Sequence, residues 1–303
     1  MKPGHPRRLV VSLTSGPMTL DLCPEIGGAV VAWRWTAPGG AAIDLMRPMR
    51  ADALASGDVE GASCFPLAPF SNRLRDGSFS YRGRRLTLPR NTAGPHVEHG
   101  HAWQRPWMAT ATTKDTACLL YRHKSDQWPF DYGLEQRFEL APDSLTVTVT
   151  ARNLSDEPMP FGFGLHPYFP KTPQTTVSAQ VAGIWETDAE VMPIRLRTPP
   201  GAPADLGGGL ALAGIDLDNC FTGWDGTAVL HWPERGLRLR MAATPPLRFL
   251  VVYAPRAEDF LCLEPVSNCT DAFNLAAQGR DDTGMIELAA LGTVSAKVVF
   301  QLC

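Results

Sequence analysis

The stretch Leu145-Thr146-Val147-Thr148-Val149-Thr150-Ala151 alternates strictly between apolar and polar side chains. Successive side chains of a β-strand point to opposite faces, so this pattern predicts a strand with one face in a core and one toward water. The same period of two recurs in Leu237-Arg238-Leu239-Arg240-Met241, and residues 294–302 are rich in β-branched side chains. The period of two therefore predicts a β-rich fold.

Turn-forming residues divide the rest of the chain into short segments. The 27 glycines and 27 prolines break most candidate helices, and we expect only short ones near residues 51–55 and 271–278. Residues 79–88 predict a hairpin that turns at Gly83. Strands without intervening helices predict an all-β fold, a large antiparallel β-sandwich, which we expect to form one domain over residues 1–303. The long surface loop is expected at residues 198–214, which contain Pro199, Pro200, Pro203 and Gly207-Gly208-Gly209.

Composition narrows the class of protein and its partners. The net charge of −3 is too mild to indicate a nucleic-acid partner or an anionic membrane surface. No run of about 18 apolar residues predicts a membrane span, and residues 1–11 lack the apolar stretch of a signal peptide. The seven cysteines are odd in number, scattered, and never in C-x-x-C, which is typical of reduced thiols. We therefore expect a cytoplasmic protein, while the oligomeric state stays open.

Several catalytic and cofactor motifs are absent from the sequence. There is no phosphate-binding G-x-x-x-x-G-K-[ST], no G-x-S-x-G nucleophile elbow and no H-E-x-x-H zinc motif. The fragment Gly162-Phe163-Gly164 lacks the third glycine of a dinucleotide site. Their absence removes most cofactor-dependent enzymes from consideration.

Polar residues instead occur in four apolar, turn-rich stretches, of the kind that often lie at strand ends facing a cleft. Taken singly, Arg73 and His166 have structural explanations, an ion pair and a hydrogen-bonded core histidine. Glu264 interrupts an apolar run, where a salt bridge and a functional acid are equal alternatives, since an unpaired buried carboxylate is costly. The stretches are Pro69-Phe70-Ser71-Asn72-Arg73, residues 96–101, residues 162–169 and Cys262-Leu263-Glu264-Pro265-Val266.

The histidines at 96, 99 and 101 raise the hypothesis of a metal site, since imidazole is a common ligand. No Asp or Cys pattern completes such a site, and Glu98 is expected to point away from its neighbours on a strand. We therefore predict no metal.

In this order and spacing, the motifs resemble those of the aldose 1-epimerase (galactose mutarotase) family. The resemblance extends from Pro24-Glu25-Ile26-Gly27-Gly28 to the final strand. It is most specific in Asn72-Arg73, His99-Gly100 with Trp107 downstream, His166-Pro167-Tyr168-Phe169, Asp218-Asn219-Cys220-Phe221 and Leu263-Glu264-Pro265. The resemblance implies a large β-sandwich, no cofactor, and interconversion of the α and β anomers of a free aldose.

The resemblance also implies roles for individual residues. His166 matches the family's catalytic acid and Glu264 its catalytic base, while Arg73, His99 and Asp218 match its sugar-binding residues; Asn72 is expected beside them. Model-compound pKa values leave Glu264 ionised at neutral pH, and its charge should favour protonated His166. Aromatic faces for the sugar are expected from Phe169, Phe221 and Trp224.

Two alternatives remain within the same family resemblance. The first is a hexose-6-phosphate 1-epimerase, for which Arg73, Arg75 and Arg105 could form a phosphate pocket. The second is a non-catalytic protein that binds or senses carbohydrate. In the histidine-rich motif, His96 or His101 could share the role given to His99.

Overall fold

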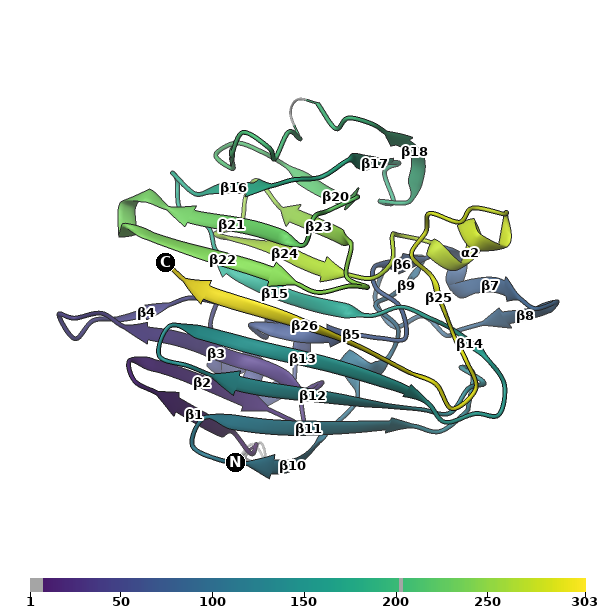
Figure 1. Ribbon diagram of the computed structural model, residues 1–303, viewed down its shortest axis with the longest axis horizontal. Coiled ribbons are helices and arrows are strands. Elements are labelled where there is room, and N and C mark those ends of the chain that lie inside the picture. The colour runs from purple at the N-terminus through teal and green to yellow at the C-terminus, as the bar shows by residue number, and fades with distance from the viewer. Residues whose placement is uncertain (1–7, 202–203) are drawn as a thin grey trace, which may run out of the picture.

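The computed structural model describes residues 8–201 and 204–303. Its first large sheet is antiparallel throughout and runs in the order β1-β2-β3-β5-β15-β24-β23-β20-β17-β18, with β4 paired to β3 (Figure 1). The strands of this sheet are β1 (Val11–Ser15), β2 (Met18–Cys23), β3 (Ala29–Thr36), β4 (Ala42–Asp44), β5 (Cys64–Leu67), β15 (Gly164–Pro170), β24 (Phe260–Val266), β23 (Phe249–Ala254), β20 (Leu217–Thr222), β17 (Gly183–Thr187) and β18 (Pro193–Arg197).

The second large sheet is also antiparallel and runs in the order β10-β11-β12-β13-β26-β22-β21-β16-β19. Its strands are β10 (Met108–Thr112), β11 (Thr116–His123), β12 (Tyr132–Leu140), β13 (Ser144–Asn153), β26 (Thr293–Leu302), β22 (Leu237–Ala243), β21 (Thr227–Trp232), β16 (Thr176–Ala179) and β19 (Leu210–Ala211). The last strand of the chain, β26, lies in the middle of this sheet (Figure 1).

Short elements connect and cover the sheets. Three two-stranded ribbons pair β6 (Arg73–Leu74) with β9 (Val97–Glu98), β7 (Ser78–Tyr81) with β8 (Arg84–Thr87), and β14 (Met159–Phe161) with β25 (Ile286–Leu288). The helices are equally short: α1 (Ala51–Ser56), α2 (Ala272–Ala277), and the 3₁₀ turns η1 (Val59–Gly61), η2 (Arg75–Gly77), η3 (Ala102–Gln104) and η4 (Pro233–Arg235). Among the described residues, no helix has the length and apolar character to cross a bilayer.

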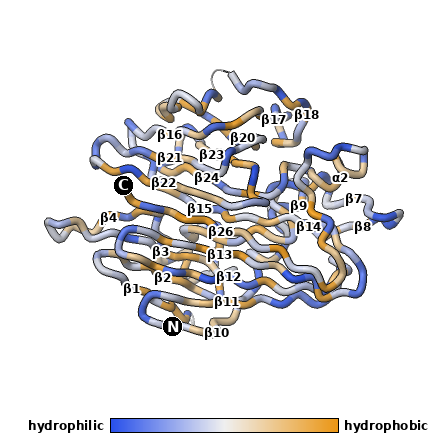
Figure 2. The backbone as a smooth tube through the Cα atoms, in the orientation of Figure 1, coloured by the Kyte–Doolittle hydropathy of each residue, from blue (hydrophilic) through white to orange (hydrophobic). Residues whose placement is uncertain are grey.

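The two sheets pack face to face through the apolar sides of their strands. Phe300 of the second sheet lies between Trp33 and Phe169 of the first, each with ring centroids 6.1 Å away. Apolar residues accordingly concentrate along the strands, and polar residues gather in the connecting turns (Figure 2). In β13, every apolar residue from Leu145 to Ala151 is buried while the intervening threonines are partly exposed. The predicted antiparallel β-sandwich is therefore confirmed.

Most of the expected local elements are also confirmed. The hairpin of β7 and β8 turns at Arg82 and Gly83, both with positive φ, and both short helices form within a residue or two of their predicted positions. The expectation of a plain surface loop at residues 198–214 is wrong in part. This segment contains the strand β19, and Ala204, Leu206 and Leu212 are buried because they pack into the core; Pro203 lies outside the described residues.

Candidate active site

The site is built on the face of the first sheet that points away from the second. In β15, Phe169 packs toward the second sheet, so the alternating positions His166 and Tyr168 point to the opposite face. On that face the strand register aligns side chains in rows. Phe65 pairs with His166, and Glu264 pairs with Val251. The register that matches Tyr168 with Cys262 brings His166 opposite Glu264.

The neighbouring row extends the same face across four strands. Tyr168 pairs with Cys262, Cys262 with Tyr253, and Tyr253 with Asp218. Antiparallel strands that are joined at this spacing place the side chains of paired residues about 5 Å apart. Sheet register therefore gathers His166, Glu264 and Asp218, which are widely separated in the sequence, on one surface.

The loops that cover this surface supply the remaining polar residues. β6 pairs with β9, so that Arg73 lies opposite Glu98. Asn72 and His99 flank this ribbon, and both adopt left-handed backbone conformations, with φ of 59° each. Gly100 is also left-handed, and a Cβ there would lie 2.3 Å from the Ala68 carbonyl oxygen, so only glycine lets the loop approach β5.

These residues enclose a cavity of about 380 Å³. Binding pockets for small molecules commonly fall between about 300 and 1,000 Å³, so the volume suits a monosaccharide. The lining combines a few aromatic rings with many ionisable groups: Glu60, Phe65, Asn72, Arg73, Thr92, Ala93, Gly94, Glu98, His99, Trp103, His166, Tyr168, Asp218, Val251, Tyr253 and Glu264. All six residues expected at the site line this one cavity.

His166 and Glu264 form the buried centre of the cavity. His166 Nε2 lies 3.3 Å from Glu264 Oε1, and the side chains are only 8% and 3% exposed. The imidazole is stacked against Tyr168, with ring centroids 4.7 Å apart, and lies at the same distance from Phe65. Neither His166 Nδ1 nor Glu264 Oε2 has a hydrogen-bond partner among the described residues. Two polar atoms are therefore buried beside the cavity without a partner in the described part of the chain.

Burial sets the direction of both pKa values. It raises the pKa of Glu264 well above that of a free carboxyl, with the charge of Asp218 adding to the effect and that of Arg73 opposing it. Burial also lowers the pKa of His166 to about 3. Burial thus acts against the expected ionised Glu264 and protonated His166, because desolvation disfavours the charged form of each group.

His99 has a defined tautomer. Its Nδ1 accepts a hydrogen bond of 3.0 Å from the backbone N–H of Asn72. Burial above all, with electrostatic repulsion from Arg73 and from any proton on His166, lowers the pKa of His99 well below its usual value and favours the neutral ring. A neutral imidazole that accepts at Nδ1 carries its proton on Nε2. His99 therefore has an N–H donor available beside His166, whose ring centroid lies 5.1 Å away.

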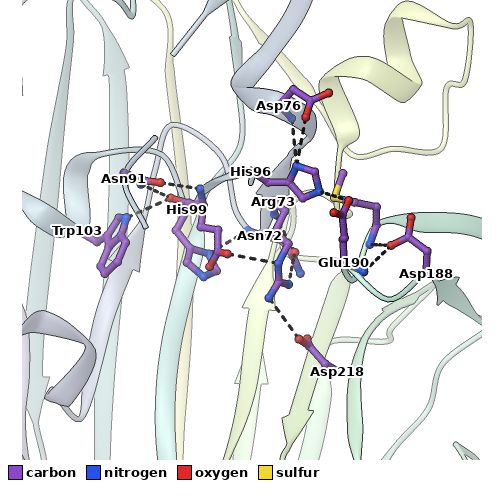
Figure 3. Close-up of polar contacts among 12 residues, drawn as sticks. Asn72, Arg73, Asp76, Asn91, His96, His99, Trp103, Asp188, Glu190 and Asp218 are labelled. Atoms are coloured by element: carbon purple, nitrogen blue, oxygen red, sulfur yellow. Dashed lines mark hydrogen bonds and ion pairs between the residues drawn. The ribbon is translucent and has the colours of Figure 1, made fainter. Parts of the chain in front are cut away.

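Arg73 lies between two carboxylates. Its Nε is 3.4 Å from Glu98 Oε1, and one terminal nitrogen is 3.5 Å from Asp218 Oδ2 (Figure 3). Asn72 fixes the start of this segment, because its Oδ1 accepts hydrogen bonds from the Arg73 backbone N–H at 2.8 Å and from the guanidinium at 3.5 Å. Asn72 is itself 3% exposed. Its side chain thus orients Arg73.

The other two histidines lie elsewhere. The buried His96 ring accepts a hydrogen bond from the Asp76 backbone N–H and lies 3.3 Å from Glu190 (Figure 3). His101 Nε2 lies 2.8 Å from the Tyr132 hydroxyl, on the side of the second sheet. Neither lines the cavity, so the structure separates His99 from its neighbours.

Three expectations about the surroundings of the site are wrong. Phe169, Phe221 and Trp224 are fully buried and absent from the cavity lining, because their strand or turn positions point them into the core. The aromatic rings at the cavity are instead Phe65, Trp103, Tyr168 and Tyr253. Period-two alternation from His166 would have selected Tyr168 over Phe169.

Glu98, expected to point away, lines the cavity beside His99, because the left-handed backbone at His99 breaks strand alternation. Nor do the three arginines converge. Arg75 pairs with Asp271 at 3.7 Å, and Arg105 lines a separate, more open hollow of about 1170 Å³ around Tyr121 and His123. That larger hollow contains none of the six expected site residues.

Cys262 adds a thiol next to the His166–Glu264 pair. One potential ligand atom from each of these three buried residues lies within 4.8 Å of the others. Nitrogen, sulfur and oxygen donors of this kind suit a soft divalent cation. Burial raises the pKa of the Cys262 thiol, so this group is protonated in the isolated protein.

Comparisons with known proteins agree with the fold. The two-sheet architecture is the galactose mutarotase-like fold, which the chain shares with a galactose mutarotase-like protein from Clostridium acetobutylicum at a TM-score of 0.86 and 18% identity, covering 98% of this chain and 96% of the other. The family model for aldose 1-epimerase matches residues 10–301. The chain therefore belongs to the aldose 1-epimerase family.

Two comparisons with Escherichia coli K12 proteins have higher identity. The uncharacterized protein YphB is 34% identical over 270 residues, which are 86% of this chain and 89% of YphB. A crystal structure described as a candidate aldose 1-epimerase superposes with a TM-score of 0.88 at 30% identity, covering 98% of this chain and 99% of the other.

Proposed function

We propose that the protein is an aldose 1-epimerase that interconverts the α and β anomers of a free aldose by opening and closing the sugar ring. One observation carries the proposal: His166 Nε2 and Glu264 Oε1 lie 3.3 Å apart at the buried end of a cavity of monosaccharide size. The substrate is a small sugar, and residues 1–303 act as one cytoplasmic domain without a nucleic-acid or membrane partner.

The reaction requires two proton transfers at one site. A base takes the proton from the C1 hydroxyl while an acid protonates the ring oxygen, which breaks the bond between C1 and that oxygen. The C1–C2 bond of the open aldehyde then rotates, and the reverse transfers close the ring on the other face. We assign Glu264 as the base and His166 as the acid; each positioned group of this kind contributes about 10²–10⁴-fold.

Substrate binding favours the protonation states of Glu264 and His166 that the reaction needs. The His166–Glu264 pair must hold one transferable proton and one vacant lone pair. Burial alone disfavours the charged forms, but a sugar hydroxyl that donates to Glu264 stabilises its carboxylate. The nearby Arg73 charge acts in the same direction. The protons thus belong to the pair, and the apparent pKa values of the reaction are those of the coupled system.

The remaining site residues bind and orient the sugar. Arg73 donates to ring hydroxyls, Asp218 accepts from adjacent hydroxyls, and the Nε2–H of His99 supports the negative charge that develops on a C1 or ring oxygen. Asn72 acts through Arg73, whose backbone and guanidinium it holds, so we propose a positioning role for it.

The charge of the cavity favours a free aldose over a hexose 6-phosphate. The only arginine in the lining, among the described residues, is Arg73, and Glu98 and Asp218 already flank it. A phosphate group would find carboxylates where it needs cations. We therefore rank the phosphate-specific alternative below mutarotation of the free sugar.

Polarimetry on freshly dissolved α-glucose, α-galactose and other aldoses tests the proposal. Catalysis should raise the rate of anomer interconversion above the buffer rate for at least one free sugar, in proportion to enzyme concentration. Sugar binding by calorimetry without any rate enhancement would support a non-catalytic carbohydrate-binding protein instead.

A further inference from the structure

We propose that Glu60 and Glu98 select the substrate by charge, so that the cavity takes aldoses that are uncharged or carry an ammonium group and rejects aldoses that carry phosphate or carboxylate. This inference builds on the proposed function only in taking the ligand to be an aldose. Neither residue belongs to the set expected from the sequence, and both line the cavity.

The cavity contains more acidic than basic side chains. Glu60, Glu98, Asp218 and Glu264 contribute four carboxyl groups, against the single guanidinium of Arg73 in the described lining. Burial raises the pKa values of Asp218 and Glu264, which favours their neutral forms. Even with both protonated, two carboxylates from Glu60 and Glu98 face one guanidinium, so the cavity stays net negative.

The guanidinium is not free to bind an anion. Glu98 Oε1 lies 3.4 Å from Arg73 Nε, and Asp218 Oδ2 lies 3.5 Å from one terminal nitrogen of Arg73. Both carboxylates hold their positions through the fold: Glu98 pairs with Arg73 across the β6–β9 ribbon, and Asp218 lies on β20. An anionic group would have to displace one of these carboxylates or lie beside it, and either costs binding free energy.

Glu60 presents a carboxylate at the cavity with no neutralising partner. Its side chain forms no ion pair or hydrogen bond with the described residues; the only contact from Arg47 goes to its backbone oxygen. Glu60 is an exposed residue, and partial desolvation at the cavity raises the pKa of its carboxyl, with the charges of Asp58 and Glu98 adding to the effect. A cation or a hydroxyl donor would relieve this repulsion, and Phe65 and Trp103 supply aromatic faces in the same cavity.

An independent feature indicates that this acidic cavity binds a ligand. Glu264 is 2% exposed and lines the cavity, yet its Oε2 has no hydrogen-bond partner among the described residues. Buried polar atoms in folded proteins are nearly always hydrogen-bonded. A ligand hydroxyl, which can both donate and accept, completes this site in either protonation state of Glu264, and an ammonium group completes the ionised form.

Four sugars of similar size separate the possibilities: glucose, glucosamine, glucose 6-phosphate and glucuronate. Affinity is measured through the fluorescence of Trp103 and its neighbours, and kcat/KM for anomer interconversion is measured over each sugar's own buffer rate. The pH is set at about 6.5, below the usual pKa of an amine. The variants are Glu60→Gln and Glu98→Gln; Glu135→Gln, an exposed residue outside the cavity, is the matched control for removal of one charge.

We expect the two anionic sugars to bind at least about tenfold more weakly than glucose, and glucosamine to bind at least as well as glucose. Each cavity variant should reduce the ratio of the affinity for glucose to the affinity for glucose 6-phosphate by about tenfold at low ionic strength. The Glu135→Gln control should leave this ratio unchanged. Equal affinity for glucose and glucose 6-phosphate, or an unchanged ratio in both cavity variants, would overturn the proposal.

The two proposals fail separately in this experiment. If affinities follow charge but none of the four sugars interconverts faster than in buffer, charge selection stands and epimerase activity toward these four sugars is refuted. If all four sugars interconvert at equal kcat/KM with equal affinity, the activity stands and charge selection is refuted. If none of the four sugars binds, charge selection is refuted, while the activity is decided by polarimetry on the other aldoses.

Discussion

Glu264 lies across the β15–β24 pair from His166, with 3.3 Å between Oε1 and Nε2, and its second carboxylate oxygen is buried without a partner among the described residues. A carboxyl group in this position is held at a cost in stability, because burial raises its pKa well above the usual value. The pair therefore links the proposed chemistry to measurable properties of the folded protein.

Glu264→Gln should stabilise the protein at about pH 8 by about 1–3 kcal/mol, since the amide removes a carboxyl group whose ionisation is disfavoured by burial in the folded state only. The sign follows from linkage. When the pKa of a carboxyl group is higher in the folded state than in the unfolded state, the free energy of unfolding of the protein falls as the pH rises above the unfolded pKa of about 4.3. The gain should therefore shrink toward about pH 4. Urea unfolding across this range measures it; a variant less stable than the parent at about pH 8 would contradict the account.

Acid should destabilise the fold through buried histidines. Burial lowers the pKa values of His101 and His166 to about 3. The unfolded chain takes up protons near pH 6.5, so the stability that these neutral rings provide is present above about 6.5 and is lost as the pH falls toward about 3. His101→Gln should reduce the slope of unfolding free energy against pH by about one proton in this window. A slope equal to that of the parent would show that His101 is protonated in the native state.

Asn72 should tolerate glycine better than alanine. Its φ of 59° favours residues that enter the left-handed region, and its Oδ1 accepts the Arg73 N–H. Asn72→Ala loses both features and should cost about 1–3 kcal/mol, whereas Asn72→Gly loses only the side-chain bond. Chemical denaturation of the two variants gives the comparison. A glycine variant that is the less stable of the two would refute the backbone explanation.

For the positioning role of Asn72, both variants should raise KM for a neutral sugar more than they lower kcat, because Arg73 is left less well oriented for ground-state binding. Asn72→Asp retains an acceptor oxygen and should recover most of the affinity. Loss of kcat alone in all three variants would place Asn72 in the chemical step.

Substitutions of His99 and His96 should have different effects on the kinetics, although the two residues are only three positions apart in the sequence. His99→Gln removes the proposed Nε2–H donor and should lower kcat by about 10²-fold. His96→Gln lies outside the cavity and should retain kcat/KM within about fivefold while losing about 1–3 kcal/mol of stability, since the Asp76 N–H loses its acceptor. Steady-state kinetics combined with unfolding measurements test both; similar kinetic losses in the two variants would argue against the unique role of His99.

The fold can be predicted from the sequence because the alternation of apolar and polar residues is a local property of each strand. The pattern at residues 145–151 predicts the buried face of β13 residue by residue, and the turn at Gly83 follows from the same local rules. The residues of the candidate site could be predicted only from the family resemblance. They line the cavity together because of strand register and loop closure, which no single segment of the sequence encodes.

Long-range geometry also explains what the sequence missed. Glu98 faces the cavity because the left-handed backbone at His99 ends the strand, and Arg105 is remote because it lies just before β10 of the second sheet and lines the separate hollow. The shifts in the pKa values of Glu264 and His166 depend on how completely both are buried, which sequence alone does not specify.

Exchange NMR of anomer interconversion by the parent, Glu264→Gln, His166→Gln and the double variant tests the central claim most directly. The account predicts that each single variant loses at least about 10²-fold in kcat, and that the double variant loses little more, since the two groups act as one proton-transfer unit. A Glu264→Gln protein that interconverts the anomers as fast as the parent would contradict it.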